Sequence, residues 1–240
     1  MEKTVYSAFI PQNTQSTGLS KWLSKISIPA YYKDEDLFNA ISHLLGAALA
    51  FSAFVWSLVT LVMTGASANE FAGILIYCTA LIVLYSASGL YHLVPAGNIK
   101  RVLRVMDHCT IYLLIAGCYT PVALIAFWGH LFAPIILAAE WGIAFLGIIV
   151  NVIDMNSMPV KVFSMISYLV MGWMVLIVPF DLLLDVGQAW FGWILAGGLA
   201  YTIGIIFYGL GSKKHYMPCV WHVFVLAGSI LQFVGFIQMI

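Results

Sequence analysis

The sequence predicts an all-α integral membrane protein, a bundle of seven transmembrane helices with its N-terminus in the cytoplasm and its C-terminus outside. Three observations lead to this prediction. The 240-residue chain is 62% hydrophobic and only 8% charged, whereas soluble domains carry about 25% charged residues. Its apolar residues form long runs without the period-2 alternation of barrel strands. Its basic residues fall in alternate connections between these runs.

The N-terminal stretch, residues 1–36, is polar and aromatic and is predicted to be a cytoplasmic tail before a transmembrane domain at 37–240. It lacks the continuous apolar core of a cleavable signal peptide, so the first helix is expected to act as its own insertion signal. A short apolar patch from Trp22 to Ile28 is predicted to lie at the membrane surface, with Trp22 and Lys25 at the interface.

Seven apolar segments follow, each long enough to cross roughly 30 Å of hydrocarbon at about 1.5 Å per residue. We expect helices at 38–63, 71–94, 104–127, 131–152, 160–180, 190–210 and 218–240. Pro95 and Gly97 end the second helix. A short basic loop holding Lys100, Arg101 and Arg104 is expected before the third. Glycines in and just after the sixth should let neighbouring helices approach closely, namely Gly197, Gly198, Gly204, Gly209 and Gly211.

The distribution of charge sets the orientation. In this topology all ten basic residues fall on one side, and they are Lys3, Lys21, Lys25, Lys33, Lys100, Arg101, Arg104, Lys161, Lys213 and Lys214. The opposite loops hold Glu70, His130, Asp181 and Asp185. By the positive-inside rule the N-terminus is cytoplasmic and Ile240 is outside. A multi-pass protein of the cell membrane, surrounded by lipids, is therefore expected.

Charge and cysteine content exclude other classes. The formal net charge is zero, which argues against nucleic acid as a partner because phosphate binding needs clustered Lys and Arg. Cys78, Cys109, Cys118 and Cys219 lie in or beside apolar runs without short paired spacing. We therefore expect buried thiols rather than a disulfide framework.

Polar residues inside the apolar segments gather near the predicted cytoplasmic face. They are Asn39, His43, Ser88, His92, Asp107, His108 and His222. The first two pairs are spaced i, i+4, so each pair can point inward together. Histidines with a carboxylate are zinc-type ligands, and zinc with an open position activates water. Alternatively, any single histidine at this depth is hydrogen-bonded or reaches towards the interface. His108 points about 100° away from Asp107 and is expected to be interfacial.

Five motifs occur in order along the chain: NAISH (39–43), SGLYHLVP (88–95), MDHCTIYLLIAGCYTP (106–121), SYLVMGW (167–173) and VWHVFVLAGS (220–229). They resemble the hemolysin III family of bacterial membrane proteins, which are relatives of the progestin and adipoQ receptors and, more distantly, of the alkaline ceramidases. In that superfamily Ser-x3-His ends helix 2, an Asp begins helix 3 and His-x3-His begins helix 7. The resemblance implies zinc ligands at His92 and His222, with Asp107 and Ser88 as catalytic residues.

The helix 7 motif departs from the family pattern. It reads PCVWH, so Pro218 stands at the first histidine position, and Gln232 also occupies a position where a family histidine is expected. Pro218 suits the first turn of a helix but cannot bind a metal. The third zinc ligand is then Cys219, which shares a face with His222, or His215, if the preceding loop folds back, or Asp107 or His43. Loss of the metal is the remaining alternative.

These observations leave three functions open. One is a zinc-dependent hydrolase of a lipid amide or ester at the inner leaflet. Another is a non-enzymatic receptor-like or membrane-homeostasis protein whose metal site is structural or lost. The third is a cytolytic pore, although no helix carries the continuous polar stripe that a pore needs. Glu140 lies in the middle of the fourth predicted helix, where a protonated or paired carboxyl, or a proton relay, is expected.

Overall fold

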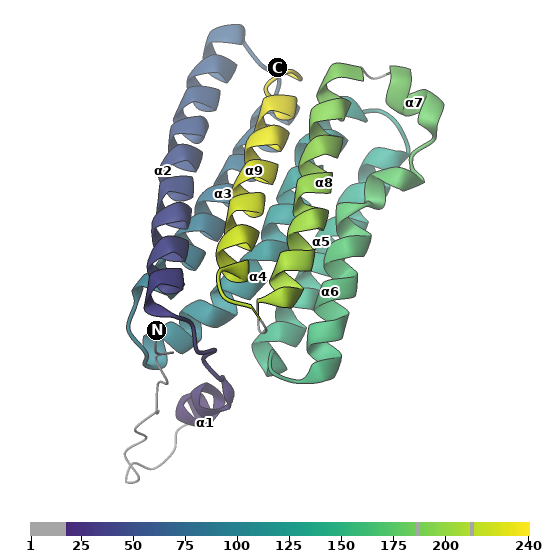
Figure 1. Cartoon of the computed structure of the whole chain (residues 1–240). Coiled ribbons are helices and arrows are strands. Elements are labelled where there is room, and N and C mark those ends of the chain that lie inside the picture. The colour runs from purple at the N-terminus through teal and green to yellow at the C-terminus, as the bar shows by residue number, and fades with distance from the viewer. Residues whose placement is uncertain (1–17, 186–187, 212–213) are drawn as a thin grey trace.

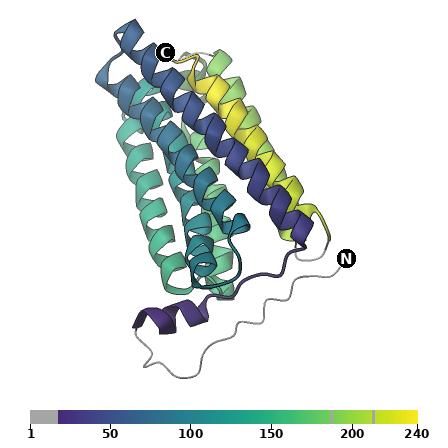
Figure 2. The same cartoon turned by 90° about the vertical axis from the view of Figure 1, so that its left-hand side faces the viewer.

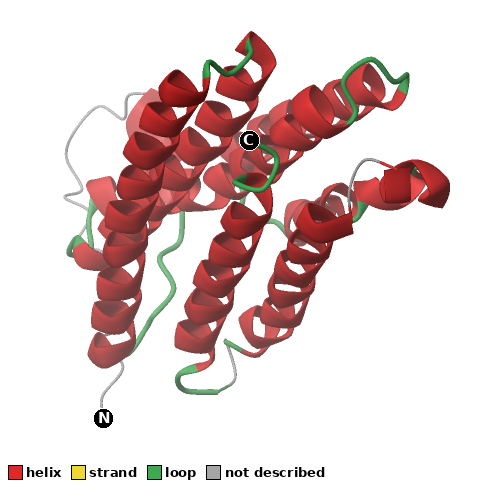
Figure 3. Ribbon diagram, turned by 90° about the horizontal axis from the view of Figure 1, so that it is seen from above, coloured by secondary structure: helices red, strands yellow, loops and turns green. Residues whose placement is uncertain are grey.

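A computed structural model describes residues 18–185, 188–211 and 214–240. These residues form helices joined by loops, most of them side by side in one bundle (Figure 1; Figure 3), which confirms the all-α fold class. The elements are α1 (Gly18–Lys25), α2 (Lys33–Thr64), α3 (Ala68–Leu93), α4 (Asn98–Pro121) with the π-helical turn η1 (Val122–Ala126), α5 (Phe132–Asp154), α6 (Met158–Gly172), the 3-10 turn η2 (Met174–Ile177), α7 (Phe180–Asp185), α8 (Gln188–Leu210) and α9 (Met217–Phe236).

Six helices of the described chain are long and apolar enough to cross a membrane: α2, α3, α4 with η1, α5, α8 and α9. The helix expected over 160–180 is instead divided into α6, η2 and α7. α6 has 15 residues, which at about 1.5 Å per residue reach only about 22 Å. The count of seven crossings therefore stays a prediction.

The Tyr119 hydroxyl explains why the chain can leave the helical path after α6. It donates to the carbonyl oxygen of Gly172 at 3.0 Å and accepts from the backbone N–H of Val175 at 3.0 Å. Backbone groups freed by a break must find partners where water is scarce. The Tyr119 side chain of α4 supplies hydrogen-bond partners for both the Gly172 carbonyl and the Val175 N–H.

The first long helix begins earlier than predicted, because α2 starts at Lys33, inside the predicted tail. Its first turn carries Asp34, Glu35 and Asp36, whose negative charge favours the positive end of the helix dipole. Glu35 Oε2 also accepts from the backbone N–H of Tyr32 at 3.0 Å. Acidic residues that looked like a polar tail are thus a helix start.

The prediction of a basic loop before the third span is also wrong, because α4 begins at Asn98. Lys100, Arg101 and Arg104 lie on its first two turns, and Lys100 and Arg104 are buried. The predicted transmembrane limits missed this because charged residues lower local hydropathy without breaking a helix.

In the bundle α9 lies between α2 and α8, while α3 packs against both α2 and α4 (Figure 1). The first residue of α2 and the last of α9 lie at opposite ends of the bundle (Figure 1). α1 lies beneath the end at which α2 begins (Figure 2). We call this the basal end.

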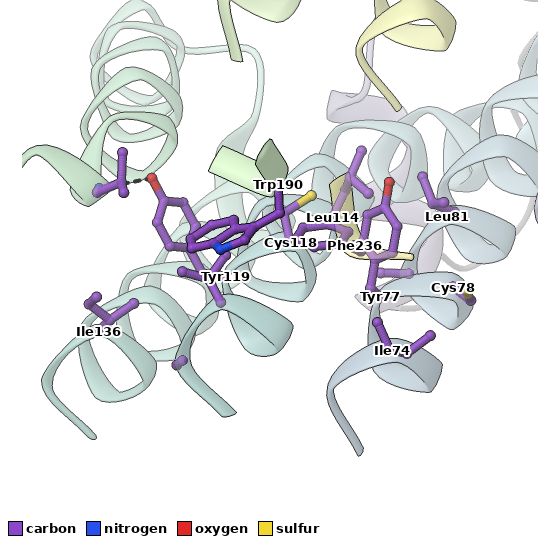
Figure 4. Packing of buried hydrophobic residues seen from close by; sticks show 14 of the residues in the cluster. Ile74, Tyr77, Cys78, Leu81, Leu114, Cys118, Tyr119, Ile136, Trp190 and Phe236 are labelled. Atoms are coloured by element: carbon purple, nitrogen blue, oxygen red, sulfur yellow. Dashed lines mark hydrogen bonds between the residues drawn. The ribbon is translucent and has the colours of Figure 1, made fainter. Parts of the chain in front are cut away.

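Aromatic side chains pack between the helices in the interior of the bundle. The rings of Tyr77 and Phe236 pack edge to face with centroids 4.5 Å apart (Figure 4). Tyr85 of α3 donates to Ser229 Oγ of α9 at 2.6 Å, and the hydroxyl of Tyr201 on α8 lies 2.7 Å from the same oxygen. Ser229 therefore joins three helices through polar contacts.

Two sequence predictions about small residues can be compared with the packing. All four cysteines are buried free thiols, as expected.

A Cβ at Gly197 would collide with Gln232, and one at Gly204 with Trp221, whereas Gly198 and Gly209 have no such neighbour within 4 Å. Close approach between α8 and α9 thus depends on only some of the predicted glycines.

Candidate functional site

Three buried histidines from three helices meet towards the basal end. His43 lies on α2, His92 on α3 and His222 on α9. The ring centroids of His43 and His222 are 4.0 Å apart, and those of His92 and His222 are 4.9 Å apart. The exposed fraction is 3% for His43 and 5% for each of the other two. The fold thus brings together the two predicted metal-binding histidines and adds His43.

A carboxylate orients His92. Nδ1 of His92 lies 2.8 Å from Oδ1 of Asp36, and Nζ of Lys100 lies 3.3 Å from the other oxygen of that carboxylate. Because an ionised carboxylate only accepts, Nδ1 carries a proton, so in the neutral tautomer Nε2 is the nitrogen with the lone pair. Sequence reasoning missed Asp36 by assigning it to the tail. Its signal was the i, i+3, i+7 spacing of Asp36, Asn39 and His43 on one helix face.

The main chain orients His222 in the same sense. Its Nδ1 lies 2.8 Å from the carbonyl oxygen of Pro218 and therefore donates to it. His43 differs, because neither ring nitrogen has a hydrogen-bond partner, and the buried side-chain amide of Asn39 also has none. Unpaired buried polar groups cost about 1–3 kcal/mol each. Among the three histidines, His43 is therefore the one whose ring nitrogens both lack a hydrogen-bond partner.

The three histidines line a cavity of about 980 Å³, at the upper end of ordinary ligand sites. Ser88 and Asp107 line the same cavity, Ser88 buried and Asp107 half-buried. The interior beyond them is formed largely by apolar side chains of α4, α6 and α8, such as Ile115, Leu169 and Ile194. A polar site at the basal end thus opens into an apolar chamber.

Two other predicted zinc ligands, Cys219 and His215, have surroundings that differ from those of the three histidines. Cys219 is buried but does not line the cavity. His215 lies at the cavity mouth, stacked on Tyr216 with centroids 3.8 Å apart, and its Nε2 is 3.5 Å from Oδ2 of Asp34. Among the described residues no group of three or more His, Cys, Asp or Glu side chains is arranged to hold a metal ion.

Three further residues from the sequence analysis have defined places. His108 is half-buried and lines the cavity, where its backbone carbonyl accepts from Tyr168. Glu140 is fully buried, and neither carboxyl oxygen has a hydrogen-bond partner. Gln232 accepts a hydrogen bond from Cys118 Sγ at 3.0 Å and lines the deep part of the cavity.

The chain between α1 and α2 crosses the mouth of the cavity, and we call residues 26–32 the strap. Residues 29–32 line the cavity, and the ring of Tyr31 meets that of His92 edge-on with centroids 5.4 Å apart. Burial raises the pKa of Tyr31 well above its ordinary value. The Tyr31 hydroxyl is therefore neutral and can donate a hydrogen bond.

Polar contacts anchor the strap and α1 to the bundle. Trp22 Nε1 donates to the carbonyl oxygen of Val152 at 2.7 Å. Arg104 Nη1 donates to Ser27 Oγ at 3.0 Å, to Asn156 Oδ1 at 2.9 Å and to the Ser27 carbonyl oxygen. This segment contacts α4, α5 and the α5 to α6 connection, and its place at the membrane surface stays a prediction.

Comparison with known proteins agrees with the motifs described above. The family model described as haemolysin-III related matches residues 31–233. Hemolysin-3 of Bacillus cereus is 32% identical over 209 residues, which cover 87% of this chain and 93% of the relative. The Hemolysin-3 homolog of Bacillus subtilis (strain 168) is 34% identical over 207 residues, covering 83% and 91% respectively. With its six long apolar helices, the chain is a multi-pass protein of the cell membrane and belongs to the haemolysin III-related family.

Proposed function

We propose that the chain is a zinc-dependent hydrolase of lipid amides or esters at the cytoplasmic leaflet. The observation that carries this proposal is the meeting of three histidines in the wall of a largely apolar cavity that Ser88 and Asp107 also line. A lipid whose scissile bond lies near its head group could place that bond at the histidines and its chain in the interior.

The donor chemistry of the cluster fits zinc. His92 and His222 each hold a proton on Nδ1, which leaves Nε2 for a metal, and Asp36 is the kind of outer partner that metal-binding histidines have. His43 would supply the third ligand that Pro218 cannot, because both of its nitrogens are unpaired. The chemistry that zinc supplies in such a site is a water molecule whose pKa falls towards 7.

The roles of the remaining residues follow from their places around the cavity. Asp107 would accept the proton of the attacking water and deliver it to the departing amine or alcohol, a role worth about 10²–10⁴ in rate. Ser88 would donate a hydrogen bond to the lipid carbonyl oxygen. The neutral Tyr31 hydroxyl would help to close the site from the strap. The products are a carboxylic acid and an amine or alcohol.

Elemental analysis of protein purified without chelators tests the metal site. We expect about one zinc per chain in the wild type and in Cys219→Ala, and a loss of most of it in His43→Ala and His92→Ala, because three ligands hold the ion. Hydrolysis of a ceramide-like substrate should disappear in the same two histidine variants. Turnover that survives His92→Ala would contradict the hydrolase. A zinc loss confined to Cys219→Ala would transfer the third ligand to that thiol.

We also propose seven crossings with a cytoplasmic N-terminus. The described basic residues lie on α1, near the starts of α2, α4 and α6, and just before α9, and these ends gather at the basal end (Figure 1). Lys3 and Lys213 lie outside the described residues. Basic residues favour the cytoplasmic side, so the histidine site would face the inner leaflet.

A second candidate is a non-enzymatic receptor-like or membrane-homeostasis protein, in which the histidine cluster only ties α2, α3 and α9 together. Pro218 at a family histidine position favours it, as does the lack of a ready-made ligand set among the described side chains. Zinc bound without turnover, or a cluster that binds no zinc, would support this candidate over the hydrolase.

The name of the two relatives, Hemolysin-3, favours a third candidate, a cytolytic pore. Liposomes that carry the purified chain and an entrapped dye separate it from the other two. A pore releases the dye in proportion to the protein added, whereas a lipid hydrolase or a receptor-like protein retains it.

A further inference from the structure

Three cationic side chains from three parts of the chain line the cavity near its mouth. Arg104 comes from α4, Lys161 from the first turn of α6 and Lys214 from the connection between α8 and α9. The carboxylates in the cavity wall are Glu35 and Asp107. Glu35 accepts from the backbone N–H groups of Tyr32 and Tyr216, and the three cations outnumber the two carboxylates of the cavity wall.

Arg104 is the most constrained of these cations. It is 6% exposed, and Nη1 contacts only neutral acceptors on Ser27 and Asn156. Its buried Nε has no acceptor, and no ion pair joins Arg104 to a carboxylate in the described part of the chain. A buried charge without a counter-charge is unfavourable. An anion in the cavity would supply one.

The shape of the cavity adds an apolar requirement. Beyond the cationic mouth, its wall includes Val122 of η1, Trp190 and Ile194 of α8 and Val225 of α9. An inorganic anion would leave this volume unused, whereas an acyl chain would fill it and be removed from water. The complementary ligand is an amphiphile.

We propose that the cavity binds a lipid with an anionic phosphate or carboxylate head group, held by Arg104 with Lys161 and Lys214, and with its chain among the apolar residues. A guanidinium edge suits either anion. The proposal names the ligand class of the cavity and rests on the proposed function only in treating that ligand as substrate. Binding itself needs neither metal nor turnover.

Titration calorimetry of the full chain in neutral detergent tests the proposal with three ligands of one chain length. We expect oleoyl lysophosphatidate and oleate to bind at least tenfold more tightly than oleoyl lysophosphatidylcholine, because a hydrogen bond to a charged group contributes about 1.5–3 kcal/mol. Inorganic phosphate alone should bind at least a hundredfold more weakly than lysophosphatidate because it has no chain. Equal binding of the anionic lipids and the zwitterionic lipid would overturn the proposal.

Variants identify the site. Arg104→Gln should weaken lysophosphatidate binding about tenfold or more, whereas Arg101→Gln should change it less than about twofold. Arg101 is a matched control, because it lies one turn away and its Nε also lacks an acceptor, but it does not line the cavity. Equal losses in the two variants would reveal mere surface attraction and refute the site.

Arg104 also anchors the strap, so a second variant keeps the test independent of folding. Lys161→Gln with Lys214→Gln changes two exposed side chains and should weaken lysophosphatidate binding severalfold without changing lysophosphatidylcholine binding. An unchanged affinity in this double variant would refute the basic mouth. His92→Ala should still bind lysophosphatidate even where hydrolysis is lost, which separates failure of this proposal from failure of the hydrolase.

Discussion

At the residue scale, the contact that most constrains the site is the carboxylate of Asp36 between His92 and Lys100. The side chain of Lys100 is 1% exposed and that of Asp36 is 13% exposed. Asp36 therefore performs two tasks, because it neutralises a buried ammonium group and determines which nitrogen of His92 carries the proton. The two tasks can be separated by mutation.

Asp36→Asn should lower the free energy of unfolding by about 3–5 kcal/mol, because it removes the carboxylate that pairs with the buried Lys100 ammonium. Asp36→Asn combined with Lys100→Met should recover much of that stability without restoring zinc binding, since the carboxylate partner of His92 is still missing. Thermal unfolding in detergent and elemental analysis provide the two measurements.

Asp34→Asn is the matched control for this prediction, because Asp34 lies in the same first turn of α2 but its side chain is 38% exposed. Its effect on stability should be much smaller than that of Asp36→Asn, because exposed charged pairs contribute little. If Asp36→Asn were as mild as Asp34→Asn, the buried pair would not have the importance assigned to it.

Glycine packing provides a second test at this scale. A Cβ at Gly147 would collide with the ring of Tyr112, whereas a Cβ at Gly142, on the same helix, would meet nothing within 4 Å. Gly147→Ala should destabilise the protein by about 1–3 kcal/mol. Gly142→Ala should be neutral or slightly stabilising because alanine favours helix. Equal melting temperatures for the two variants would contradict the close packing of α4 on α5.

At the scale of elements, the strap and the break after α6 show how the chain covers and shapes the cavity. The strap is anchored by polar contacts at Ser27 and Asn156 rather than by a helix of its own. Segments held by a few hydrogen bonds open at lower free energy than the core. Access to the cavity past the strap is therefore expected to be controlled separately from the stability of the bundle.

Asn156→Ala should loosen the strap, because Asn156 Oδ1 binds both Ser27 Oγ at 2.8 Å and Arg104 Nη1 at 2.9 Å. Limited proteolysis should then cut within residues 18–32 several times faster, while thermal unfolding of the bundle changes by less than about 1 kcal/mol. Ser24→Ala is the control, since Ser24 Oγ only donates to the nearby carbonyl of Lys21 at 2.8 Å. Similar cleavage of both variants would argue against the anchor.

At the scale of the whole molecule, α2 begins and α9 ends at opposite ends of the bundle (Figure 1). If the bundle spans the membrane once for each passage of the chain, the two termini lie on opposite sides. The short α6 is the part of the chain on which this conclusion depends, because its 15 residues are fewer than the roughly 20 of an ordinary transmembrane helix.

Reporter fusions measure this topology directly. A fluorescent protein that matures only in the cytoplasm should be bright when fused before Met1 and dark when fused after Ile240. A phosphatase that is active only outside the cytoplasm should be active only when fused after Ile240. Both results are expected because loops rich in basic residues stay in the cytoplasm. A bright fusion after Ile240 would mean an even number of crossings, with the segment α6 to α7 returning to the side from which it came.

The sequence by itself determined the class of the molecule. Mean composition and runs of apolar residues depend on the chain alone, so the membrane helices α3, α5, α8 and α9 lie within a few residues of their predicted limits. Helical periodicity also indicated that Ser88 and His92 share a face, and the motifs indicated the family. Composition, periodicity and motifs depend only on residues that are close together along the chain.

Only the tertiary structure decided which residues from different helices meet. Cys219 and His43 were both open as partners of His222, and the rotation and proximity of α2 relative to α9 brought His43 to the ring. Asp36 and Arg104 looked like solvated charges, but contacts with α3, α4 and the strap give them hydrogen-bond partners within the fold. Spacing along one helix identifies a face, but helix packing determines what that face contacts, and packing depends on complementary surfaces across the whole chain.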